Sequence, residues 1–107
     1  MPKLLIVDDE PNVLYSLRAG LASDDLEVAT ARTARQGLAL VGSERPDVAV
    51  VDVRLPDMSG LELFDRVKAA DPRLPVVVVT AFAAAETAIE AMKRGAFDYL
   101  LKPVDLH

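Results

Sequence analysis

The stretch Lys3–Glu10 reads KLLIVDDE, in which four apolar residues are followed by three consecutive carboxylates. The apolar run lacks the strict alternation of a half-exposed strand, so it predicts a parallel β-strand that is buried on both faces. Three like charges at the end of a buried strand repel one another unless a positive group lies beside them. The rest of the sequence can therefore be searched for that positive group.

Length, composition and charge exclude several classes of protein. The chain has 107 residues, 51% of them hydrophobic, which suits one compact domain. It contains no cysteine, which excludes a disulfide framework and a thiolate metal site. Neither a signal peptide nor a membrane span is expected, because the apolar runs are too short. With a net charge of −5 and scattered Lys and Arg, we expect a soluble cytoplasmic domain that does not itself bind DNA or membranes.

Short apolar runs recur along the chain and alternate with segments of helical length. The predicted strands are Leu4–Val7, Leu26–Ala31, Val48–Val51, Val76–Val79 and Phe97–Leu101. Helices are expected from Pro11 onward, with Val13, Leu14, Leu17 and Leu21 on one face, and over three further ranges: Thr33 to about Gly42, Ser59 to Ala70 and about Ala84 to Arg94. Pro11 suits a first helical turn, and Thr33 with Gln36 has the spacing of a capping box.

This order of elements predicts an α/β fold with a doubly wound, five-stranded parallel sheet. Right-handed crossovers and one reversal of winding favour the flavodoxin-like strand order 2-1-3-4-5. In such sheets, binding sites form outside the carboxyl ends of the strands, where the winding reverses. The residues at those ends are therefore the candidates for function.

Polar side chains follow four of the predicted strands: Asp8, Asp9 and Glu10, then Asp52, then Thr80, then Lys102 ahead of Pro103. Each has an ordinary structural interpretation. One of the three N-terminal acids could cap the helix at Pro11, Asp52 could be a turn residue, Thr80 could close a strand, and Lys102 could be a solvated lysine. These interpretations do not explain why all of these residues would gather at one edge of the sheet.

Carboxylates crowded together favour a divalent cation, and an all-oxygen ligand set without His or Cys favours Mg²⁺. A magnesium site bordered by Lys102 and Thr80, with one further carboxylate, has the parts that phosphoryl transfer needs. The metal and the ammonium would neutralise phosphoryl oxygens while an Asp52 oxygen attacks in line. The product would be an acyl phosphate on Asp52.

The sequence resembles the receiver domain of bacterial two-component response regulators. The resemblance covers essentially the whole chain and rests on LIVDDE, VAVVDVRLPDMSGLEL, VVVVTAF and GAFDYLLKP in order. It implies that Asp52 is the phosphoacceptor. It also implies that Asp9 binds Mg²⁺ directly, that Asp8 assists, partly through water, and that the backbone carbonyl of Arg54 completes the protein ligands.

The resemblance further implies how phosphorylation is sensed. Lys102 would pair with the phosphoryl group and precede a cis peptide bond to Pro103, while Thr80 would donate its hydroxyl to a phosphoryl oxygen. Tyr99 falls at the switch aromatic, which turns inward when Thr80 moves, although an aromatic at a strand end can also be simple packing. Arg54 and Phe82 would flank the path of an attacking water and tune the phosphoryl lifetime.

The resemblance also implies partners. The donor would be a phosphohistidine on a sensor histidine kinase or a phosphotransfer protein, and small acyl phosphates often replace it. The stretch GAFDYLLKP resembles receivers of enhancer-binding transcription activators, so the output is expected to be transcriptional. No output domain is recognised in this sequence.

Two other functions remain as alternatives. A phosphatase of the haloacid dehalogenase type also uses a strand-end Asp nucleophile with Mg²⁺, but its second Asp, two residues later, is replaced by Arg54. We therefore expect no enzymatic turnover. A phosphorylation-independent interaction module is the other alternative, although such modules typically lack one of the acids, the Thr or the Lys. All of these are present in this chain.

The sequence stops at His107, before the fifth helix that receivers normally have. We expect residues 1–107 to form a receiver domain truncated after the fifth strand, with apolar surface of the third to fifth strands exposed to water. The predicted consequence is instability, self-association or cover borrowed from a partner. Self-association would use this sheet face, or the surface of the fourth helix and fifth strand.

Overall fold

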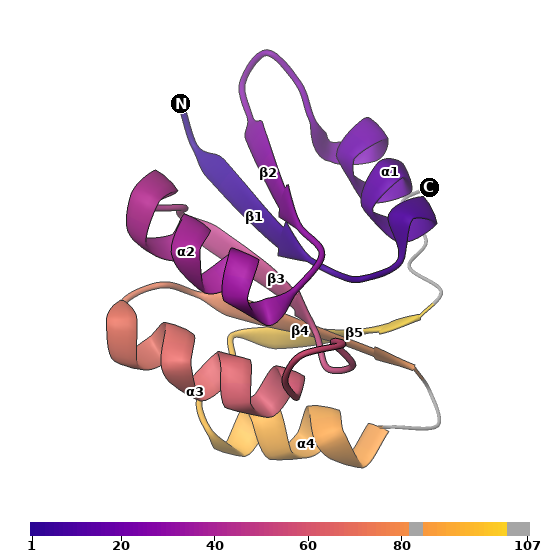
Figure 1. The fold of residues 1–107 in the computed structure, drawn as a ribbon, viewed down its shortest axis with the longest axis vertical. Helices are drawn as coiled ribbons and strands as arrows, with labels where there is room; N and C mark the ends of the chain where they lie inside the picture. The colour runs from indigo at the N-terminus through magenta and orange to yellow at the C-terminus, as the bar shows by residue number, and fades with distance from the viewer. Residues whose placement is uncertain (82–84, 103–107) are drawn as a thin grey trace.

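The computed structural model describes residues 1–81 and 85–102, which form a three-layered α/β domain (Figure 1). The strands are β1 Lys3–Val7, β2 Glu27–Ala31, β3 Val48–Asp52, β4 Val76–Ala81 and β5 Asp98–Lys102. The helices are α1 Pro11–Leu21, α2 Ala34–Glu44, α3 Gly60–Ala70 and α4 Ala85–Lys93. None of the described helices is both long and apolar enough to span a bilayer.

The five strands are all parallel and lie in the order β2-β1-β3-β4-β5, which confirms the predicted topology. Winding reverses between β1 and β3, which are paired from Leu4↔Val48 to Val7↔Val51. Helices α2, α3 and α4 cover one face of the sheet and α1 packs on the other (Figure 1). The carboxyl ends of β1 and β3 therefore lie side by side at the reversal.

Strand β1 contributes to both cores, as its apolar run predicted. Leu5 and Val7 belong to the large core beneath α2, α3 and α4, while Leu4 and Ile6 pack with Leu14 and Leu17 of α1. All four residues of this run are at most 8% exposed. Because alternate side chains are buried on opposite faces, no register of β1 would leave a polar face to water. Its observed pairing, from Leu4↔Val48 to Val7↔Val51, leaves Asp8 at the carboxyl end.

The start of α2 follows its sequence signal more closely than its end does. The Thr33 hydroxyl caps α2 by accepting the Gln36 N–H at 3.1 Å, while the Gln36 side chain accepts the Arg32 N–H. In the expected capping box the Gln36 side chain would accept the Thr33 N–H, but here it accepts the N–H of the preceding residue, Arg32. Helix α2 extends beyond the predicted Gly42 to Glu44. Its C-cap residue is Arg45, whose φ of 47° lies in the left-handed region. A left-handed residue there closes the helix without glycine.

Strands β3, β4 and β5 end later than the apolar runs indicated, at Asp52, Ala81 and Lys102. Thr80 lies within β4 and Lys102 is the last residue of β5, where both were expected to follow their strands. The difference arises because the backbone ladder with the neighbouring strand continues through Thr80↔Leu101 and Ala81↔Lys102, irrespective of side-chain polarity. Both residues still lie at the carboxyl edge of the sheet.

The apolar exposure expected on the third to fifth strands is largely confined to β5 at the edge of the sheet. Tyr99 and Leu100 are each 41% exposed, whereas Val79 of β4 is only 1% exposed. Val50 of β3 is partly buried against the cluster around α1. An edge strand has a neighbour on one side only, which leaves more of its side chains accessible. Self-association through this surface stays a prediction.

Candidate functional site

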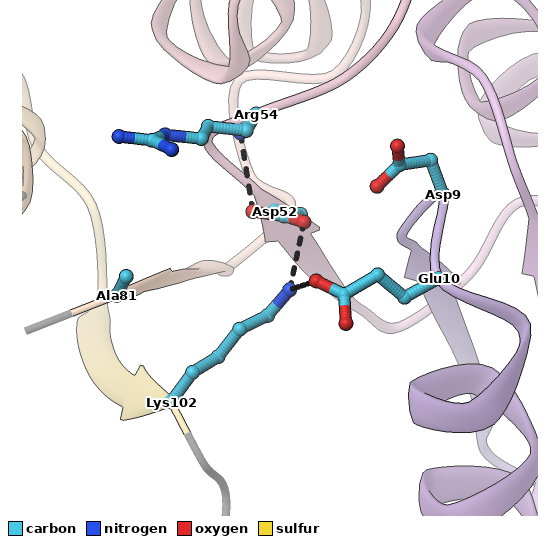
Figure 2. Close-up of a pocket in the computed structure, with 6 residues that line it drawn as sticks. All are labelled: Asp9, Glu10, Asp52, Arg54, Ala81 and Lys102. Carbon is cyan, nitrogen blue, oxygen red and sulfur yellow. Dashed lines mark hydrogen bonds and ion pairs between the residues drawn. The ribbon is translucent and has the colours of Figure 1, made fainter.

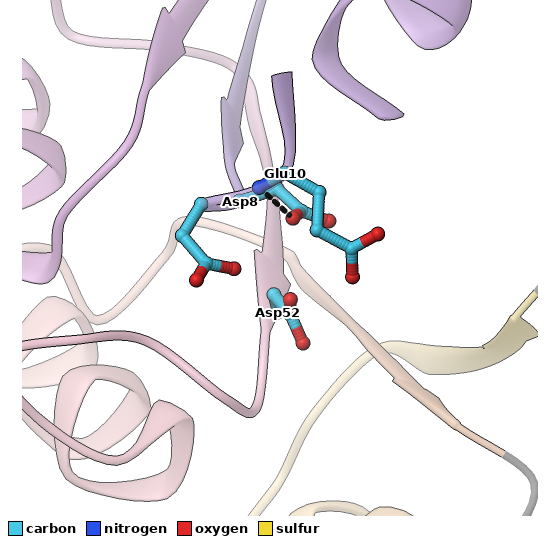
Figure 3. Close-up of side chains that lie close together, drawn as sticks. Asp8, Glu10 and Asp52 are labelled. Carbon is cyan, nitrogen blue, oxygen red and sulfur yellow. Dashed lines mark hydrogen bonds between the residues drawn. The ribbon is translucent and has the colours of Figure 1, made fainter. Parts of the chain in front are cut away.

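Four carboxylates meet where β1 and β3 end. Asp8, Asp9 and Glu10 follow β1, and Asp52 is the last residue of β3. One carboxylate oxygen from each lies within 4.8 Å of the others. Figure 3 shows Asp8 and Asp52 close together beside Glu10. Pairing of Val7 with Val51 brings the two strand ends together, as the predicted topology required.

Lys102 is the positive group among these acids. Its Nζ lies 2.8 Å from Glu10 Oε1, 2.9 Å from Asp52 Oδ2 and 3.1 Å from Asp8 Oδ2. Figure 2 shows its side chain reaching from the end of β5 toward Asp52 and Glu10. The lysine side chain is only 16% exposed. The interpretation of Lys102 as a solvated lysine is therefore wrong, and the crowding of charge after β1 has its counter-ion.

Burial and ion pairing act in opposite directions on the titration of this cluster. Burial opposes the charged form of Lys102, but hydrogen bonds to Glu10, Asp52 and Asp8 outweigh it and hold the lysine pKa above its ordinary value. Burial raises the pKa of Asp8, an effect opposed by the hydrogen bond from the Glu10 N–H and reinforced by the charge of Asp52. The ammonium of Lys102 therefore remains charged at neutral pH.

The carboxylate of Asp52 is held from both sides. Its Oδ1 accepts the Arg54 backbone N–H at 3.1 Å, and its Oδ2 accepts from Lys102 at 2.9 Å. Asp8 makes a similar local contact, since its Oδ1 accepts the Glu10 N–H at 2.9 Å (Figure 3). Asp52 does bond to a backbone N–H two residues ahead, as a turn residue would, but its second oxygen faces Lys102. The two interpretations of Asp52 are thus compatible.

No side-chain cap was found for α1 among the three acids. The N-cap residue is Glu10, whose side chain makes no capping hydrogen bond and instead contacts Lys102. Asp8 bonds to the Glu10 N–H, which lies outside the helix. Helix α1 begins at Pro11, which has no N–H to satisfy. The side chains of these acids therefore do not cap α1 and can contribute to the site.

An open cavity of about 240 Å³ lies in front of Asp52 (Figure 2). Its lining consists of Asp9, Glu10, Asp52, Arg54, Ala81 and Lys102. Asp52 itself is 3% exposed, while Glu10 and Arg54 are exposed residues at the rim and Asp9 is partly exposed. A small anion or a hydrated cation entering this cavity would meet the Asp52 carboxylate, which is held at both oxygens.

The remaining predicted residues lie at different distances from the cavity. Thr80 is completely buried in β4, one residue beyond Val79, the strand partner of Asp52. Its hydroxyl donates to the Ala81 carbonyl at 3.4 Å. Tyr99 is on the edge strand with 41% of its surface exposed, which is compatible with both a switch and partly buried packing. Phe82, and the Lys102–Pro103 peptide bond through Pro103, lie outside the described residues.

Two contacts were not predicted from the sequence. Glu10 supplies the shortest of the three ion pairs to Lys102, although its only assigned role was a possible helix cap. Asp57, in the loop after β3, accepts the backbone N–H groups of Ala34 and Arg35 at the start of α2. No pattern near Asp57 could have predicted this contact, because Asp57 and Ala34 lie 23 residues apart in the sequence.

The donor set fits a hard divalent cation. All four clustered side chains offer carboxylate oxygens, and Asp9 and Glu10 leave oxygens facing the open cavity (Figure 2). Mg²⁺ prefers such ligands, takes one or two carboxylates and keeps several waters, for which an open cavity leaves room. The oxygen-only chemistry of the site therefore suits the Mg²⁺ that the sequence predicts.

Comparisons with known proteins agree with this geometry. The sequence model of the response regulator receiver domain matches residues 4–107. The chain belongs to this family. Receiver domains are regulators in two-component systems, and the family generally binds Mg²⁺ in an acidic pocket and partners with histidine kinases. The acidic cluster described above corresponds to such a pocket.

Curated relatives of this receiver domain include the DNA-binding transcriptional regulator NtrC of Salmonella typhimurium, which is 39% identical over 94% of this chain. Regulatory protein AtoC of Escherichia coli (strain K12) is 41% identical over 97% of this chain, and response regulator protein PilR of Pseudomonas aeruginosa is 43% identical over 97%. For AtoC and PilR the matched region is 23% of the relative. The chain thus spans just under a quarter of the length of these relatives.

Solved structures show the same fold. A response regulator receiver domain protein from Clostridium thermocellum superposes with a TM-score of 0.92 at 34% identity, covering 99% of this chain and 86% of that one. A CheY-like receiver domain protein from Methanospirillum hungatei JF-1 superposes with a TM-score of 0.91 at 35% identity, covering 99% and 85%. The predicted flavodoxin-like architecture is therefore confirmed.

Proposed function

We propose that residues 1–107 are a single receiver domain that accepts a phosphoryl group on Asp52 in a Mg²⁺-dependent reaction. The observation that carries this proposal is the environment of Asp52, a buried carboxylate that is held at both oxygens and faces an acid-lined cavity. A nucleophile needs such fixed orientation toward the atom it attacks. The Lys102 ammonium lies where an incoming phosphoryl group would place negative charge.

In the proposed reaction, an Asp52 oxygen attacks the phosphorus of a phosphohistidine on a sensor kinase or phosphotransfer protein. An O–P bond forms as the P–N bond breaks, and the leaving imidazole nitrogen takes up a proton. Lys102 stays charged and exchanges one carboxylate contact for a phosphoryl oxygen. Bound Mg²⁺, held by Asp8, Asp9 and the Arg54 carbonyl, would stabilise the charge on the phosphoryl oxygens.

Phosphorylation is proposed to act through Thr80 and Tyr99. The Thr80 hydroxyl, which donates to the Ala81 carbonyl at 3.4 Å, would turn toward a phosphoryl oxygen. Movement of Thr80 would make room for the exposed Tyr99 ring to turn inward and would reshape the surface of α4 and β5. The phosphoryl group biases this equilibrium by contacts that exist only in one state.

The output and location follow from the same proposal. The relatives are about four times as long as this chain, so an output domain in another part of the full-length protein would read the α4 and β5 surface. Transcription control is the output we propose, because the relatives include proteins named as transcriptional regulators. The reaction places the domain in the cytoplasm, where sensor kinases obtain their phosphoryl groups.

The test of the proposed function is the intact mass of the protein after incubation with acetyl phosphate. We expect a gain of one phosphoryl group in Mg²⁺ and no gain when EDTA replaces the metal. A gain that does not depend on the metal would contradict the proposed role of Mg²⁺. Repeated turnover of acetyl phosphate at a catalytic rate would instead favour the phosphatase alternative, despite the exposed Arg54 where that class has its second Asp.

Asp9→Ala is expected to lower the affinity for Mg²⁺ by at least roughly tenfold, since one of few carboxylate ligands is lost. Isothermal titration calorimetry of parent and variant measures the change. Asp24→Ala is the matched control, because Asp24 is an exposed aspartate in the turn before β2. An unchanged magnesium titration for Asp9→Ala would contradict the assignment of this ligand.

A further inference from the structure

The loop between β3 and α3, residues 53–59, is attached to a helix that precedes it in the sequence. Asp57 Oδ1 accepts the Ala34 N–H at 2.8 Å, and Asp57 Oδ2 accepts the Arg35 N–H at 3.0 Å. These are the first two amides of α2, which have no acceptor within the helix itself. One loop carboxylate therefore uses both oxygens to hold the start of a neighbouring helix.

The start of α2 has a second capping residue with a separate duty. Thr33 Oγ1 accepts the Gln36 N–H at 3.1 Å, so Thr33 serves the third amide while Asp57 serves the first two. The hydrogen bonds from Ala34 and Arg35 hold the pKa of Asp57 below its ordinary value. Asp57 is therefore a carboxylate at neutral pH. Thr33 caps the helix only from within its own segment, whereas Asp57 joins two segments.

The ends of the loop are also closed. The Gly60 N–H donates to the Val53 carbonyl at 2.8 Å, and Arg54 and Ser59 form an isolated antiparallel bridge. A side chain at Gly60 would collide with the backbone of Asp52 and Val53, so α3 starts directly against the end of β3. These contacts join the two ends of the loop to each other, whereas Asp57 joins the middle of the loop to α2.

This loop supplies the hydrogen-bond donor to one of the two Asp52 carboxylate oxygens. The Arg54 N–H, just inside the closed end of the loop, donates to Asp52 Oδ1 at 3.1 Å. Arg54 also lines the cavity in front of Asp52. A displacement of the loop would therefore move the donor that orients Asp52, and with it the Arg54 backbone.

From these contacts we infer that Asp57 is a positioning residue for Asp52: by tying the β3–α3 loop to the start of α2, it fixes the Arg54 backbone that orients the Asp52 carboxylate. The role of this carboxylate as phosphoacceptor rests on the proposed function, but the tie itself does not. Helix α2 and the site then move together, because the same carboxylate belongs to the loop and caps the helix.

The test compares Asp57→Ala with Thr33→Ala. Both variants remove a cap from α2, but only Asp57→Ala also frees the loop. The first readout is amide hydrogen exchange of the metal-free protein. For Asp57→Ala we expect exchange of the Arg54 N–H to accelerate by roughly tenfold or more. For Thr33→Ala we expect faster exchange at Gln36 and no comparable change at Arg54.

The second readout is the affinity for Mg²⁺, measured by calorimetry. Residues that orient metal ligands typically contribute a factor on the order of ten, so Asp57→Ala should bind Mg²⁺ about tenfold more weakly than Thr33→Ala. Asp57→Asn keeps one acceptor oxygen and should lie between parent and Asp57→Ala in both readouts.

The outcomes separate this inference from the proposed function. Equal Arg54 exchange in Asp57→Ala and Thr33→Ala would overturn the positioning role, whether or not the protein binds metal. Faster Arg54 exchange in Asp57→Ala alone would support it. A parent protein that neither binds Mg²⁺ nor gains a phosphoryl group would contradict the proposed function, and the exchange comparison would still decide the role of Asp57.

Discussion

Asp52→Asn is expected to abolish the mass gain that the parent protein shows with Mg²⁺ and acetyl phosphate. The substitution keeps the shape of the side chain, and the amide oxygen can still accept the Arg54 N–H that now reaches Oδ1. It removes the negative oxygen that faces Lys102 at 2.9 Å, and an amide is a poor nucleophile. Intact mass spectrometry of the two proteins, treated in parallel, measures the effect.

The control for this experiment is Asp24→Asn, which changes an exposed aspartate outside the site. It should gain one phosphoryl group as the parent does. An equal gain in Asp52→Asn would show that another residue is the acceptor. If neither the parent nor the variants gain mass while circular dichroism shows them folded, the phosphorylation-independent interaction module becomes the better explanation.

Lys102→Ala is expected to destabilise the metal-free protein by about 3–5 kcal/mol, the usual cost of removing one partner from a buried ion pair. The side chains of Asp8 and Asp52 are only 3% and 4% exposed, so neither can be well hydrated once the ammonium is gone. Mg²⁺ should restore much of the loss, since it replaces the missing positive charge. Urea unfolding with and without Mg²⁺ measures both effects.

Lys93→Ala is the matched control, because Lys93 is an exposed lysine in the last turn of α4. Its unfolding free energy should change little. A Lys102→Ala protein as stable as the Lys93→Ala protein without metal would contradict the structural role of the ion pairs.

After phosphorylation, Lys102→Ala is also expected to lack the changes in α4 amide shifts that the parent shows by NMR. Persistence of those shift changes in Lys102→Ala would contradict a role for Lys102 in the switch.

The topology and the site edge were predictable because they depend on patterns that are local in the sequence. Each strand is a short apolar run, and parallel strands bring their carboxyl ends to one edge. Asp8, Asp52 and Lys102 could thus be assigned to one place without knowing any contact between them. Thr80, from the neighbouring β4, was placed at the same edge by the same reasoning.

The contacts between segments were not predictable in this way. Nothing near Asp57 indicates that its carboxylate caps α2, since the partners are brought together only by packing of two crossovers. Glu10 follows two other acids, and the sequence does not decide which of them the lysine contacts. The end of α2 at Glu44 was also missed, because helix ends depend on which backbone carbonyls find other partners.

Because Lys102 is the last residue of β5, the charge balance of the acidic site depends on the attachment of this edge strand. Its ion pair with Glu10 joins residues 92 positions apart, and its contact with Asp52 joins residues 50 apart. Whenever β5 frays from β4, the acids lose their counter-ion at the same moment. A cation that neutralises those acids therefore changes how often β5 detaches from β4. By thermodynamic reciprocity, a partner that binds β5 changes how readily the acids accept a new cation or a phosphoryl group.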